Sequence, residues 1–536
     1  MTMLKRDLSE MPEETALLGE KIWKATHPYR VIGDHLVDIV KDEQFEDMYD
    51  LETGRHALSP ALLAMITIFQ FQESLPDREA AEMVAARLDW KYALHLPLDY
   101  EGFHYSCLCY FRQRLLAHDK DALVFEAILN KVKSLGFIKR KGKQRTDSTA
   151  VIGAVRELSR LEMVTETLRV AVKAITKADQ AWAKRGLPAS FRETYVETRP
   201  DYRLTERERE DALRNVGQDG LWLLEQLEKV KSEGVRKTAE VDVLRKVWHQ
   251  QYEQVDGIAK PKKGQVNCRE LIVSPHDPGV RIGQKRGKGW IGEKVHVTET
   301  AERGDVHFIT DVATENSSSA DVEALRGIRE RESQREVLPG EQYVDAGYVS
   351  GKELADSQKA GIELLGPALS DTSQKEFKLA DFPYDEERRG FVCPAGELSV
   401  GSSWRPLHDG SIALHVKFKA RTCANCTMRS RCTDSKQGRT LQISEHHQLV
   451  MQRRVEAQTT EFREKMKTRA AVEGTISELV RKHGLRRHRY RGEDKRRMEN
   501  LFKAAACNLK RLVRAMIARE VAASGVYRMR EMAVAL

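Results

Sequence analysis

Predicted strands and helices alternate along the middle of this 536-residue sequence, and this alternation narrows the possible folds more than any other feature. Residues 144–152 are rich in Thr and β-branched residues and predict a strand. Further strands are expected at 293–298, 307–312 and 342–344, with a helix from about Ser319 before the last of them. Strands that alternate with helices predict an α/β core.

The rest of the chain predicts additions to that core. Residues 155–262 are densely charged and carry apolar residues at helical spacing, which predicts several long helices. Residues 380–445 contain cysteines and favour β-structure. The expected division is a helical N-terminal domain (1–135), a core built from 136–154, 263–379 and 446–520, a helical insertion (155–262), a cysteine-containing β-rich insertion (380–445) and a C-terminal tail (521–536).

Residues 1–135 predict an all-α domain of short helices joined by tight turns. A Ser-Pro pair at 59–60 is typical of a helix start, and Asp119 is expected to cap the last helix. Arg112 and Arg114 place positive charge on one of these helices. A helix-turn-helix-like DNA-binding module has these features, and so do many other small helical domains.

Two short segments concentrate the positive charge of a chain whose formal net charge is only +8. Residues 139–145 carry five basic residues and no acidic one, and residues 481–497 carry nine basic and two acidic residues. Together these segments hold +12, so the remainder of the chain is about −4. Two concentrated patches favour a nucleic acid as the partner, and the alternative is an ordinary solvated surface.

Basic residues that could contact DNA phosphates fall in three stretches. The loop at 277–292 is rich in Gly, Lys and Arg, but its glycine spacing does not match a nucleotide-binding phosphate loop, so a basic hairpin is expected there. In 484–492, Arg residues alternate with His488 and with Tyr490, whose ring could stack on a base. The candidate DNA contacts are Arg112, Arg114, Lys285, Arg286, Lys288, Arg486, Arg487, Arg489 and Arg491.

Composition argues against several other classes of protein. Hydrophobic residues make up 41% and charged residues 32% of the chain, as in soluble globular proteins, and no apolar run is long enough to cross a bilayer. The first 14 residues are polar and charged, unlike a secretory signal. Eight cysteines in a chain of this length do not form a disulfide scaffold. We therefore expect a cytoplasmic protein with no membrane partner.

Three carboxylates are candidates for a divalent-metal site. Asp147 lies within one expected strand and Asp345 at the end of another, so both can reach one edge of a sheet. Glu473 lies at the border of the buried stripe of an expected helix at 468–483, and Arg469 one turn earlier could orient it or contact a phosphate. Phosphodiester cleavage uses divalent cations held by such carboxylates. Because the chain has 81 acidic residues, ordinary surface carboxylates are the alternative.

Four cysteines have the spacing of a structural zinc site. Cys393 precedes a Cys-x2-Cys-x5-Cys run, and a Cys-x2-Cys turn supplies two thiolates to tetrahedral Zn²⁺. The predicted ligands are Cys393, Cys423, Cys426 and Cys432, and the alternative is four reduced thiols without metal. The other cysteines have no partner pattern and are expected to be buried apolar residues: Cys107, Cys109, Cys268 and Cys507.

Several sequence blocks together resemble the DDE-class transposases of bacterial insertion sequences. They are TDSTAVIGAVRELSRLEMVTETLR, GQKRGKGWIGEKVHVTET, YVDAGYVSGKEL, FVCPAGELS with RTCANCTMRSRC, and VEGTISELVRKHGLRRHRYRG with AAACNLKRL. They run in order over about residues 30–515 and resemble the subgroup with an N-terminal helical DNA-binding domain and a cysteine-containing insert before the catalytic Glu. Related transposases often carry a Tyr-x2-Arg-x3-Glu-x6-Lys signature. Two positions depart from it here, because Met466 stands at the Tyr position and Val480 at the Lys position.

The resemblance implies an RNase H-like catalytic core in which Asp147, Asp345 and Glu473 are the catalytic carboxylates and Arg469 fits the signature beside them. It also implies two Mg²⁺ or Mn²⁺ ions per site. Double-stranded DNA is the expected partner, as terminal inverted repeats and target DNA, and a homodimer or higher oligomer is expected because the chemistry pairs two ends. A cytoplasmic, nucleoid-associated location follows.

The expected activity is cleavage at the ends of an insertion sequence followed by strand transfer of the freed 3′-OH. Two alternatives remain open from the sequence. One is a metal-dependent nuclease of the same fold, and the other is a non-catalytic DNA-binding protein derived from a transposase.

Overall fold

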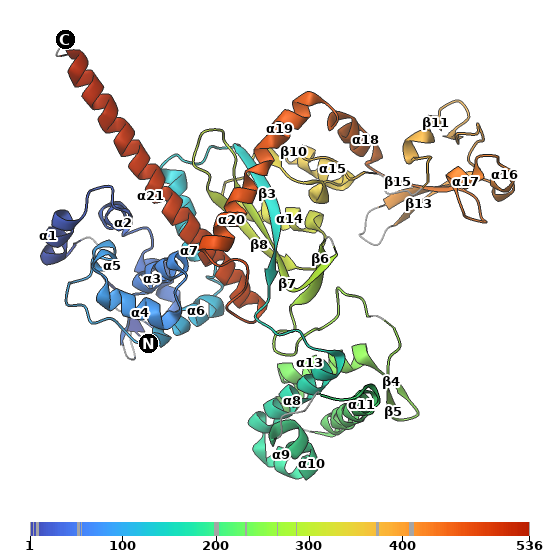
Figure 1. Cartoon of the computed structure of the whole chain (residues 1–536), viewed down its shortest axis with the longest axis horizontal. Helices are drawn as coiled ribbons and strands as arrows, with labels where there is room; N and C mark the ends of the chain where they lie inside the picture. The colour runs from blue at the N-terminus through green and yellow to red at the C-terminus, as the bar shows by residue number, and fades with distance from the viewer. Residues whose placement is uncertain are drawn as a thin grey trace.

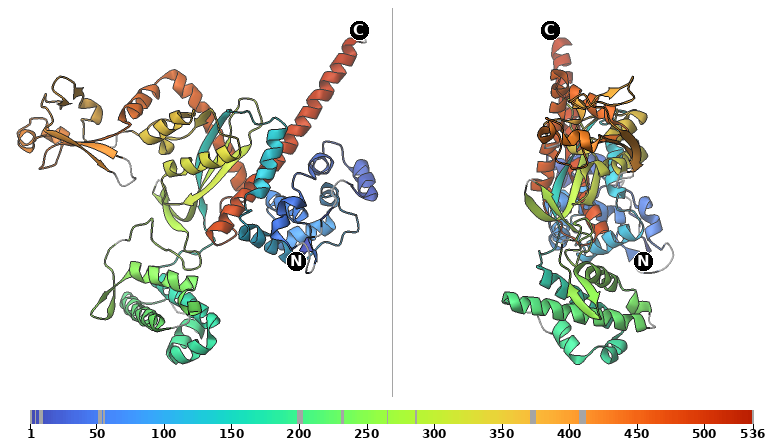
Figure 2. Two further views of the ribbon diagram at one scale, coloured as in Figure 1. Left: turned by 180° about the vertical axis from the view of Figure 1, so that it is seen from behind. Right: turned by 90° about the vertical axis from the view of Figure 1, so that its right-hand side faces the viewer.

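The structure, a computed structural model, shows a central sheet from which three lobes extend (Figures 1 and 2). The lobes are the helical N-terminal part, a helical insertion and a cysteine-containing insertion. Beyond residue 523 only the backbone of the last helix is described. The structure describes residues 2–534 except for 4, 7–9, 51–53, 55, 198–202, 231–232, 265, 286, 371–374 and 407–411.

The central sheet is mixed, with parallel strands on one side and antiparallel strands on the other. Its order is β10-β9-β3-β7-β6, and β8 also pairs with β7. β10, β9 and β3 are parallel neighbours, whereas β7 is antiparallel to β3, β6 and β8. The strands are β3 (Lys143–Ile152), β6 (Arg281–Lys285), β7 (Lys288–Thr300), β8 (Ile309–Asn316), β9 (Glu341–Tyr343) and β10 (Glu363–Leu365). The predicted α/β core, its four expected strands and the basic hairpin, β6-β7, are confirmed with small shifts at the strand ends.

Helices cover this sheet, and one of them joins it to the N-terminal domain. They are α14 (Asp321–Gln334), α15 (Gly351–Lys359), α18 (His447–Glu456), α19 (Thr460–Ala470), α20 (Val472–Lys482) and α21 (Glu493–Val534), with the short η3 (Ala346–Tyr348). The prediction of a single helix at 468–483 is wrong, because α19 ends at Ala470 and a separate helix, α20, begins at Val472. α21 also runs through most of the segment expected to be a tail.

The first half of α21 is buried between the sheet and the N-terminal helices. Phe502 stacks on Phe71 of the N-terminal domain, with ring centroids 5.7 Å apart. On the other side, the Asn508 side chain donates to the carbonyl of Ile309 and accepts from its N–H, both at 2.8 Å. Because an amide side chain that pairs with a strand backbone satisfies donor and acceptor together, α21 docks both parts in one core.

The N-terminal domain is helical, as predicted. Ser59 caps α3 by accepting from the N–H of Leu62, which confirms the expected start. Asp119 does not cap α7, because Ala122 is the N-cap residue and Asp119 adopts φ 53° in the preceding turn. The elements are β1 (Thr2–Met3), α1 (Glu13–Ile22), α2 (Pro28–Leu36), η1 (Asp42–Met48), β2 (His56–Ala57), α3 (Pro60–Glu73), α4 (Asp77–Ala86), α5 (Leu88–Ala93), α6 (Ser106–Ala117) and α7 (Leu123–Ser134).

The helical insertion leaves the sheet after β3, returns before β6 and has its own hydrophobic core. Its glycines permit close packing, because a Cβ at Gly220 would lie 1.9 Å from the Trp248 ring. The structure adds a hairpin to the expected helices. The elements are α8 (Arg160–Ala178), α9 (Gln180–Gly186), α10 (Ala189–Arg192), η2 (Glu193–Glu197), α11 (Glu206–Lys229), α12 (Glu233–Arg236), α13 (Ala239–Gln251), β4 (Tyr252–Val255) and β5 (Ile258–Pro261).

The cysteine-containing insertion is a small β-structure around Phe382, Val416, Phe418 and Leu441. It projects from the side of the sheet where β10 lies (Figure 1). Its elements are η4 (Leu379–Asp381), β11 (Tyr384–Asp385), β12 (Gly390–Phe391), β13 (Gly401–Pro406), β14 (Ile412–Lys417), α16 (Ala420–Ala424), α17 (Arg429–Cys432) and β15 (Thr440–Ser444). No helix in the described ranges is long and apolar enough to span a bilayer.

Candidate carboxylate site and nucleic-acid interface

Asp147 lies on β3, in the middle of the sheet, and is only 8% exposed. Its Oδ1 accepts from the N–H of Ser148 at 2.7 Å, and Arg469 donates to its Oδ2 at 3.2 Å. Burial raises the pKa of the Asp147 carboxyl, the Ser148 N–H and Arg469 oppose that rise, and the charge of Asp345 adds to it. Asp147 is thus a buried carboxylate with few compensating partners.

Asp345 follows β9 by two residues and lies next to Asp147 for a reason of register. β9 is parallel to β3, and Arg145 pairs with Tyr343, so two more residues bring Asp147 level with Asp345. Asp345 begins the turn η3, where its Oδ1 accepts from the N–H of Gly347 at 2.8 Å. The structure therefore brings the two predicted aspartates together.

Glu473 lies in the first turn of α20, one turn after Arg469. Its side chain is exposed and makes no hydrogen bond or ion pair with any residue in the described ranges. The structure pairs Arg469 with Asp147, and among the described residues no contact joins Arg469 to Glu473; a phosphate contact by Arg469 stays a prediction. Glu473 is thus close in sequence to a site residue but is not itself joined to the two aspartates.

Asp321 is a carboxylate near the site that sequence reasoning missed. It lies at the start of α14, where Lys294 forms an ion pair with it at 2.9 Å and Ser148 Oγ donates to it at 3.4 Å. A Cβ on Gly347 would lie 3.0 Å from Asp321 Oδ2 and 3.1 Å from Asp345 Oδ1, so both carboxylates flank this glycine. An acid at a helix start is common, so the sequence contained no distinctive signal.

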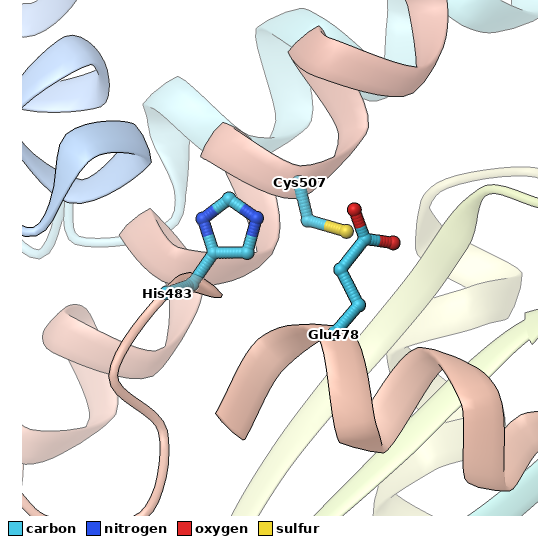
Figure 3. Close-up of side chains that lie close together, drawn as sticks. All are labelled: Glu478, His483 and Cys507. Atoms are coloured by element: carbon cyan, nitrogen blue, oxygen red, sulfur yellow. The ribbon is translucent and has the colours of Figure 1, made fainter. Parts of the chain in front are cut away.

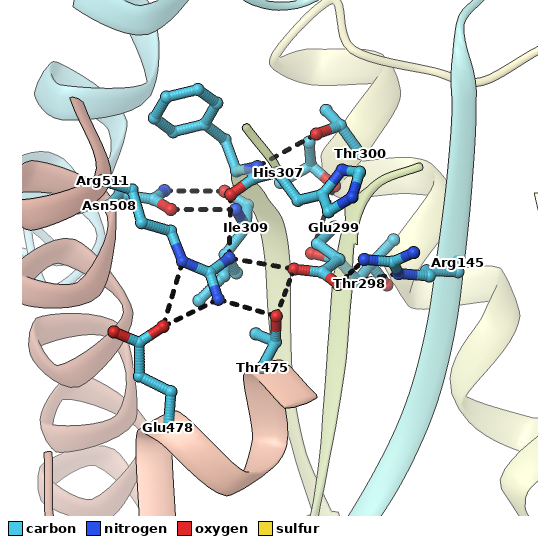
Figure 4. A network of polar contacts seen from close by, with 12 residues as sticks. Arg145, Thr298, Glu299, Thr300, His307, Ile309, Thr475, Glu478, Asn508 and Arg511 are labelled. Atoms are coloured by element: carbon cyan, nitrogen blue, oxygen red, sulfur yellow. Dashed lines mark hydrogen bonds and ion pairs between the residues drawn. The ribbon is translucent and has the colours of Figure 1, made fainter. Parts of the chain in front are cut away.

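Two side chains of α20 attach that helix to its neighbours. Glu478 lies beside Cys507 of α21, with His483 nearby (Figure 3). Arg511 of α21 donates to Glu478 and to Thr475, and Thr475 donates to the buried Glu299 of β7 at 2.6 Å (Figure 4). These contacts fix the helix that carries Glu473 against the sheet.

Glu299 also connects this network to the strand that carries Asp147. Arg145 of β3 donates to Glu299 at 2.7 Å and to the carbonyl of Thr468 at 3.0 Å, near the end of α19. A cation at a helix C-terminus satisfies carbonyls left without helical partners. Arg145 therefore stabilises the end of α19 close to the break at Ala471.

The four cysteines of the predicted zinc site line one pocket. Burial raises the pKa of Cys432, Arg439 opposes that rise, and the other three thiols add to it. In the part of the chain that the structure describes, only Glu478, His483 and Cys507 bring three possible ligand atoms within 4.8 Å of one another. The thiol donor set suits Zn²⁺, but the four sulfurs are more widely spaced than a bound ion requires.

The remaining cysteines differ from the prediction that all are buried. Cys507 is fully buried, as expected, whereas Cys107 is only partly buried. Cys109 and Cys268 are exposed, so the prediction is wrong for them. Cys109 lies on the outer face of α6 and Cys268 in a loop, and nothing in an isolated cysteine distinguishes these positions from a core position.

The basic segment at 484–492 divides into exposed and structural residues. It pairs with the end of β3 through two backbone hydrogen bonds. The N–H of Ile152 donates to the carbonyl of Arg486, and the N–H of His488 donates to the carbonyl of Ile152. Arg486, Arg487 and Arg491 are exposed along this edge, although Arg491 also donates to the carbonyl of Ala154.

Other predicted DNA contacts in and beside this segment are engaged within the protein. Arg489 donates to the carbonyl of Leu75 at 2.7 Å and lies over the ring of Phe71. Arg112 is buried, forms an ion pair with Asp77 and lies over the ring of Tyr490. Burial of Arg112 contradicts its prediction as a DNA contact, whereas Arg489 is half-buried and its contact with DNA stays a prediction.

The remaining candidates lie in two other places. Lys285 and Lys288 are exposed at the tip of the β6-β7 hairpin, and Arg286 between them lies outside the described residues. Arg114 is partly exposed and lies over the Tyr49 ring. The rings of 484–492 are not presented to a base, because His488 is buried against Glu293 and Glu499 and Tyr490 packs with Arg112.

Comparison with known protein families gives two matches. A model described as a transposase DDE domain matches residues 392–513, and a model described as a transposase domain (DUF772) matches residues 18–114. The chain is related to the DDE transposases of insertion sequences. The resemblance read from the sequence blocks is therefore confirmed. No curated protein and no solved structure matches the chain.

The two matches cover different parts of the chain. The first spans most of the cysteine-containing insertion, α18 to α20 with Glu473, and the buried half of α21. The second begins within α1 and ends within α6. Neither includes β3 or β9, so Asp147 and Asp345 lie outside both matched segments.

Proposed function

We propose that this transposase cleaves DNA at the ends of an insertion sequence, with divalent metal ions, and transfers the freed 3′-OH to target DNA. The observation that carries the proposal is that Asp147 on β3 and Asp345, two residues beyond the parallel strand β9, lie close enough for the charge of Asp345 to raise the pKa of Asp147. The order of strands in the mixed sheet supports an RNase H-like core. On one side of β3 lie the parallel strands β9 and β10, and on the other side β7 is antiparallel to β3 and β8 is antiparallel to β7.

The donor set fits Mg²⁺ or Mn²⁺. These hard cations prefer carboxylate oxygens, and Asp147, Asp345 and the unpaired Glu473 supply them. When bound, such ions activate the attacking water or 3′-OH and stabilise the leaving oxygen. The ionised form of Asp147 would be the ligand, and in the structure Arg469 contacts that carboxylate.

Glu473 is suited to be the third ligand because no residue in the described part of the chain forms a hydrogen bond or ion pair with its carboxylate. Its helix is held by Thr475 and Glu478, while its own carboxylate stays free at the exposed side. α20 packs against β3, and the contact between Arg469 and Asp147 keeps the start of α20, where Glu473 lies, close to the strand that carries Asp147.

DNA is proposed to lie across the edge where basic residues are exposed. Arg486 and Arg487 at the end of β3 and Lys285 and Lys288 on the hairpin would contact phosphates. The N-terminal domain would recognise terminal inverted repeats. Because two ends are joined, the active form is proposed to be a homodimer or a higher oligomer on DNA, at the nucleoid in the cytoplasm. The four-cysteine pocket is proposed to hold Zn²⁺ as a structural ion.

The test is cleavage of a labelled duplex that carries the native ends of the element, in Mg²⁺ or Mn²⁺. We compare the unsubstituted protein with Glu473→Gln and with a matched control, Glu461→Gln, an exposed acid on the neighbouring helix. Nicking at the end boundary that is lost only in Glu473→Gln supports the proposal. Cleavage that survives Glu473→Gln overturns the assignment of the third carboxylate.

A second readout follows the fate of the freed 3′-OH. Joined product with target DNA is expected from a transposase. Cleavage without joining indicates a nuclease of the same fold, and binding of the ends without cleavage indicates a non-catalytic DNA-binding derivative. Either result contradicts the proposed activity.

A further inference from the structure

Three potential metal ligands meet where the N-terminal domain, α20 and α21 come together. Glu478 is on α20, His483 ends that helix, and Cys507 is on α21. Their ligand atoms all lie within 4.8 Å of one another, and both His483 and Cys507 are fully buried (Figure 3). This group is separate from the aspartate site and from the four-cysteine pocket.

The His483 ring is oriented as a metal ligand would be. Its Nδ1 lies 3.4 Å from the carbonyl of Phe71 on α3, so Nδ1 carries the proton and donates to that carbonyl. Its Nε2 therefore has a lone pair, and it is buried with no hydrogen-bond partner among the described residues. Figure 3 shows Nε2 facing Cys507. Histidines that bind metals commonly donate their other ring N–H to a backbone carbonyl in this way.

We propose that Glu478, His483 and Cys507 bind one transition-metal ion of the Zn²⁺ class. Imidazole and thiolate ligands favour Zn²⁺ or a similar ion over Mg²⁺, which prefers oxygen ligands. Water would complete the four-coordinate shell. The ion is distinct in chemistry from those proposed for catalysis.

Charge balance sets the conditions for binding. Lys510 and Arg511 form ion pairs with Glu478, and burial raises the pKa of the Cys507 thiol to about 12. Binding of M²⁺ forms the metal–sulfur bond and releases the thiol proton to solvent. Burial keeps His483 neutral by lowering its pKa to about 4, so its Nε2 needs no deprotonation.

The two cations beside Glu478 can accommodate the metal. Arg511 keeps other partners, because it also donates to Glu299, Thr475 and the carbonyl of His307. Lys510 is partly exposed, so its ammonium can turn to water when Glu478 binds the ion. Neither cation is left buried and unpaired.

The ion would connect elements that the proposed function requires to act together. Glu478 is on the helix that starts with Glu473, and His483 is held by Phe71 of the N-terminal domain. Cys507 lies on α21, which packs against both parts. A bound ion would therefore fix the proposed DNA-recognition domain against the helix of the proposed third carboxylate.

The experiment counts bound metal without reference to DNA cleavage. The full chain is stripped with chelator and reconstituted with Zn²⁺, and zinc per chain is measured by mass spectrometry. Co²⁺ replaces Zn²⁺ in parallel to detect thiolate ligation by absorption. To isolate the site, the background protein carries Cys393→Ser, Cys423→Ser, Cys426→Ser and Cys432→Ser.

In this background we expect one ion per chain, with a Co²⁺–thiolate band. Adding Cys507→Ala should remove both, whereas adding Cys268→Ser, an exposed cysteine, should remove neither. No bound ion in the background protein, or an ion retained after Cys507→Ala, would overturn the proposal.

The same comparison is made with the four cysteines intact, in case the serine substitutions prevent folding. Cys507→Ala alone should lower bound zinc by one equivalent and abolish part of the thermal stabilisation that zinc provides. Unchanged stoichiometry overturns the proposal. Because neither readout depends on cleavage, failure here leaves the proposed transposase activity standing, and failure of cleavage leaves this site standing.

Discussion

The surroundings of Glu299 and of Asp147 show two ways of burying a carboxylate in the same sheet. Glu299 on β7 is contacted by Arg145, Arg511 and Thr475, so its oxygens are fully engaged. Asp147 on neighbouring β3 receives one backbone N–H and one arginine at 3.2 Å, and its pKa is raised. A carboxylate with a full set of hydrogen-bond and ion-pair partners stabilises the fold. A carboxylate with few such partners keeps oxygen atoms available for a metal ion.

The largest expected effect is on chemistry at Asp147. Asp147→Asn keeps the shape of the side chain but removes the charge that a divalent cation requires. We expect cleavage of the end duplex to fall by about 10³-fold or more, since residues of one catalytic unit cannot substitute for each other. Single-turnover cleavage measures this, and the melting temperature should not fall below that of the unsubstituted protein. A cleavage rate of Asp147→Asn within tenfold of that of the unsubstituted protein would contradict the assignment of Asp147 as a metal-binding carboxylate.

The counterpart substitution, Glu299→Gln, should act on stability. It removes the charge that pairs with the buried Arg145 and Arg511, and breaking a buried ion pair costs about 3–5 kcal/mol. Denaturant unfolding measures the free energy, with Glu464→Gln as a control because that acid pairs only on the surface. Equal stability of the two variants would show that Glu299 is not structural.

Substitution of Asp321 is expected to affect cleavage less than substitution of Asp147. It has one ion-pair partner, Lys294, and flanks Gly347 together with Asp345. We expect Asp321→Asn to lower cleavage by about 10–100-fold, the usual range for a group that orients a metal ligand, with little change in stability. Titration of Mn²⁺ should show that more metal is needed for half-maximal cleavage. An unchanged metal requirement would place Asp321 outside the site.

The positions of the two aspartates in or just after strands could be predicted because strand patterns depend on local residues, whereas their pairing across parallel strands was implied by the family resemblance. Asp147 and Asp345 lie in or just after strands whose β-branched residues are visible in the sequence. The sequence could not show that Arg469 contacts Asp147, because that contact joins residues 322 positions apart.

Exposure was harder to predict, since it depends on tertiary packing. Arg486 and Arg489 look alike in the sequence, yet the first is exposed and the second is engaged with Leu75 and Phe71. The same holds for cysteines, because Cys507 lies in an apolar helix that becomes buried only when the N-terminal domain packs on it. His483 gave no signal because its partner Phe71 is 412 positions away.

The smallest expected effect is the pH dependence that separates Asp147 from a carboxylate stabilised by its partners. Its pKa in the folded protein is above the ordinary value of 3.8, so the folded state holds the proton more tightly than the unfolded chain. Stability from this group is therefore full below pH 3.8 and is lost as the pH rises through the raised pKa. Asp147→Asn lacks this loss, so its advantage in unfolding free energy should be present at pH 7 and should shrink in acid. Metal binding has the opposite slope, because Mn²⁺ needs the ionised carboxylate, so affinity should rise with pH over the same window. Unfolding curves and Mn²⁺ titrations across that window test both slopes. A stability advantage that grows in acid would mean that Arg469 outweighs burial, and Asp147 would then resemble Glu299.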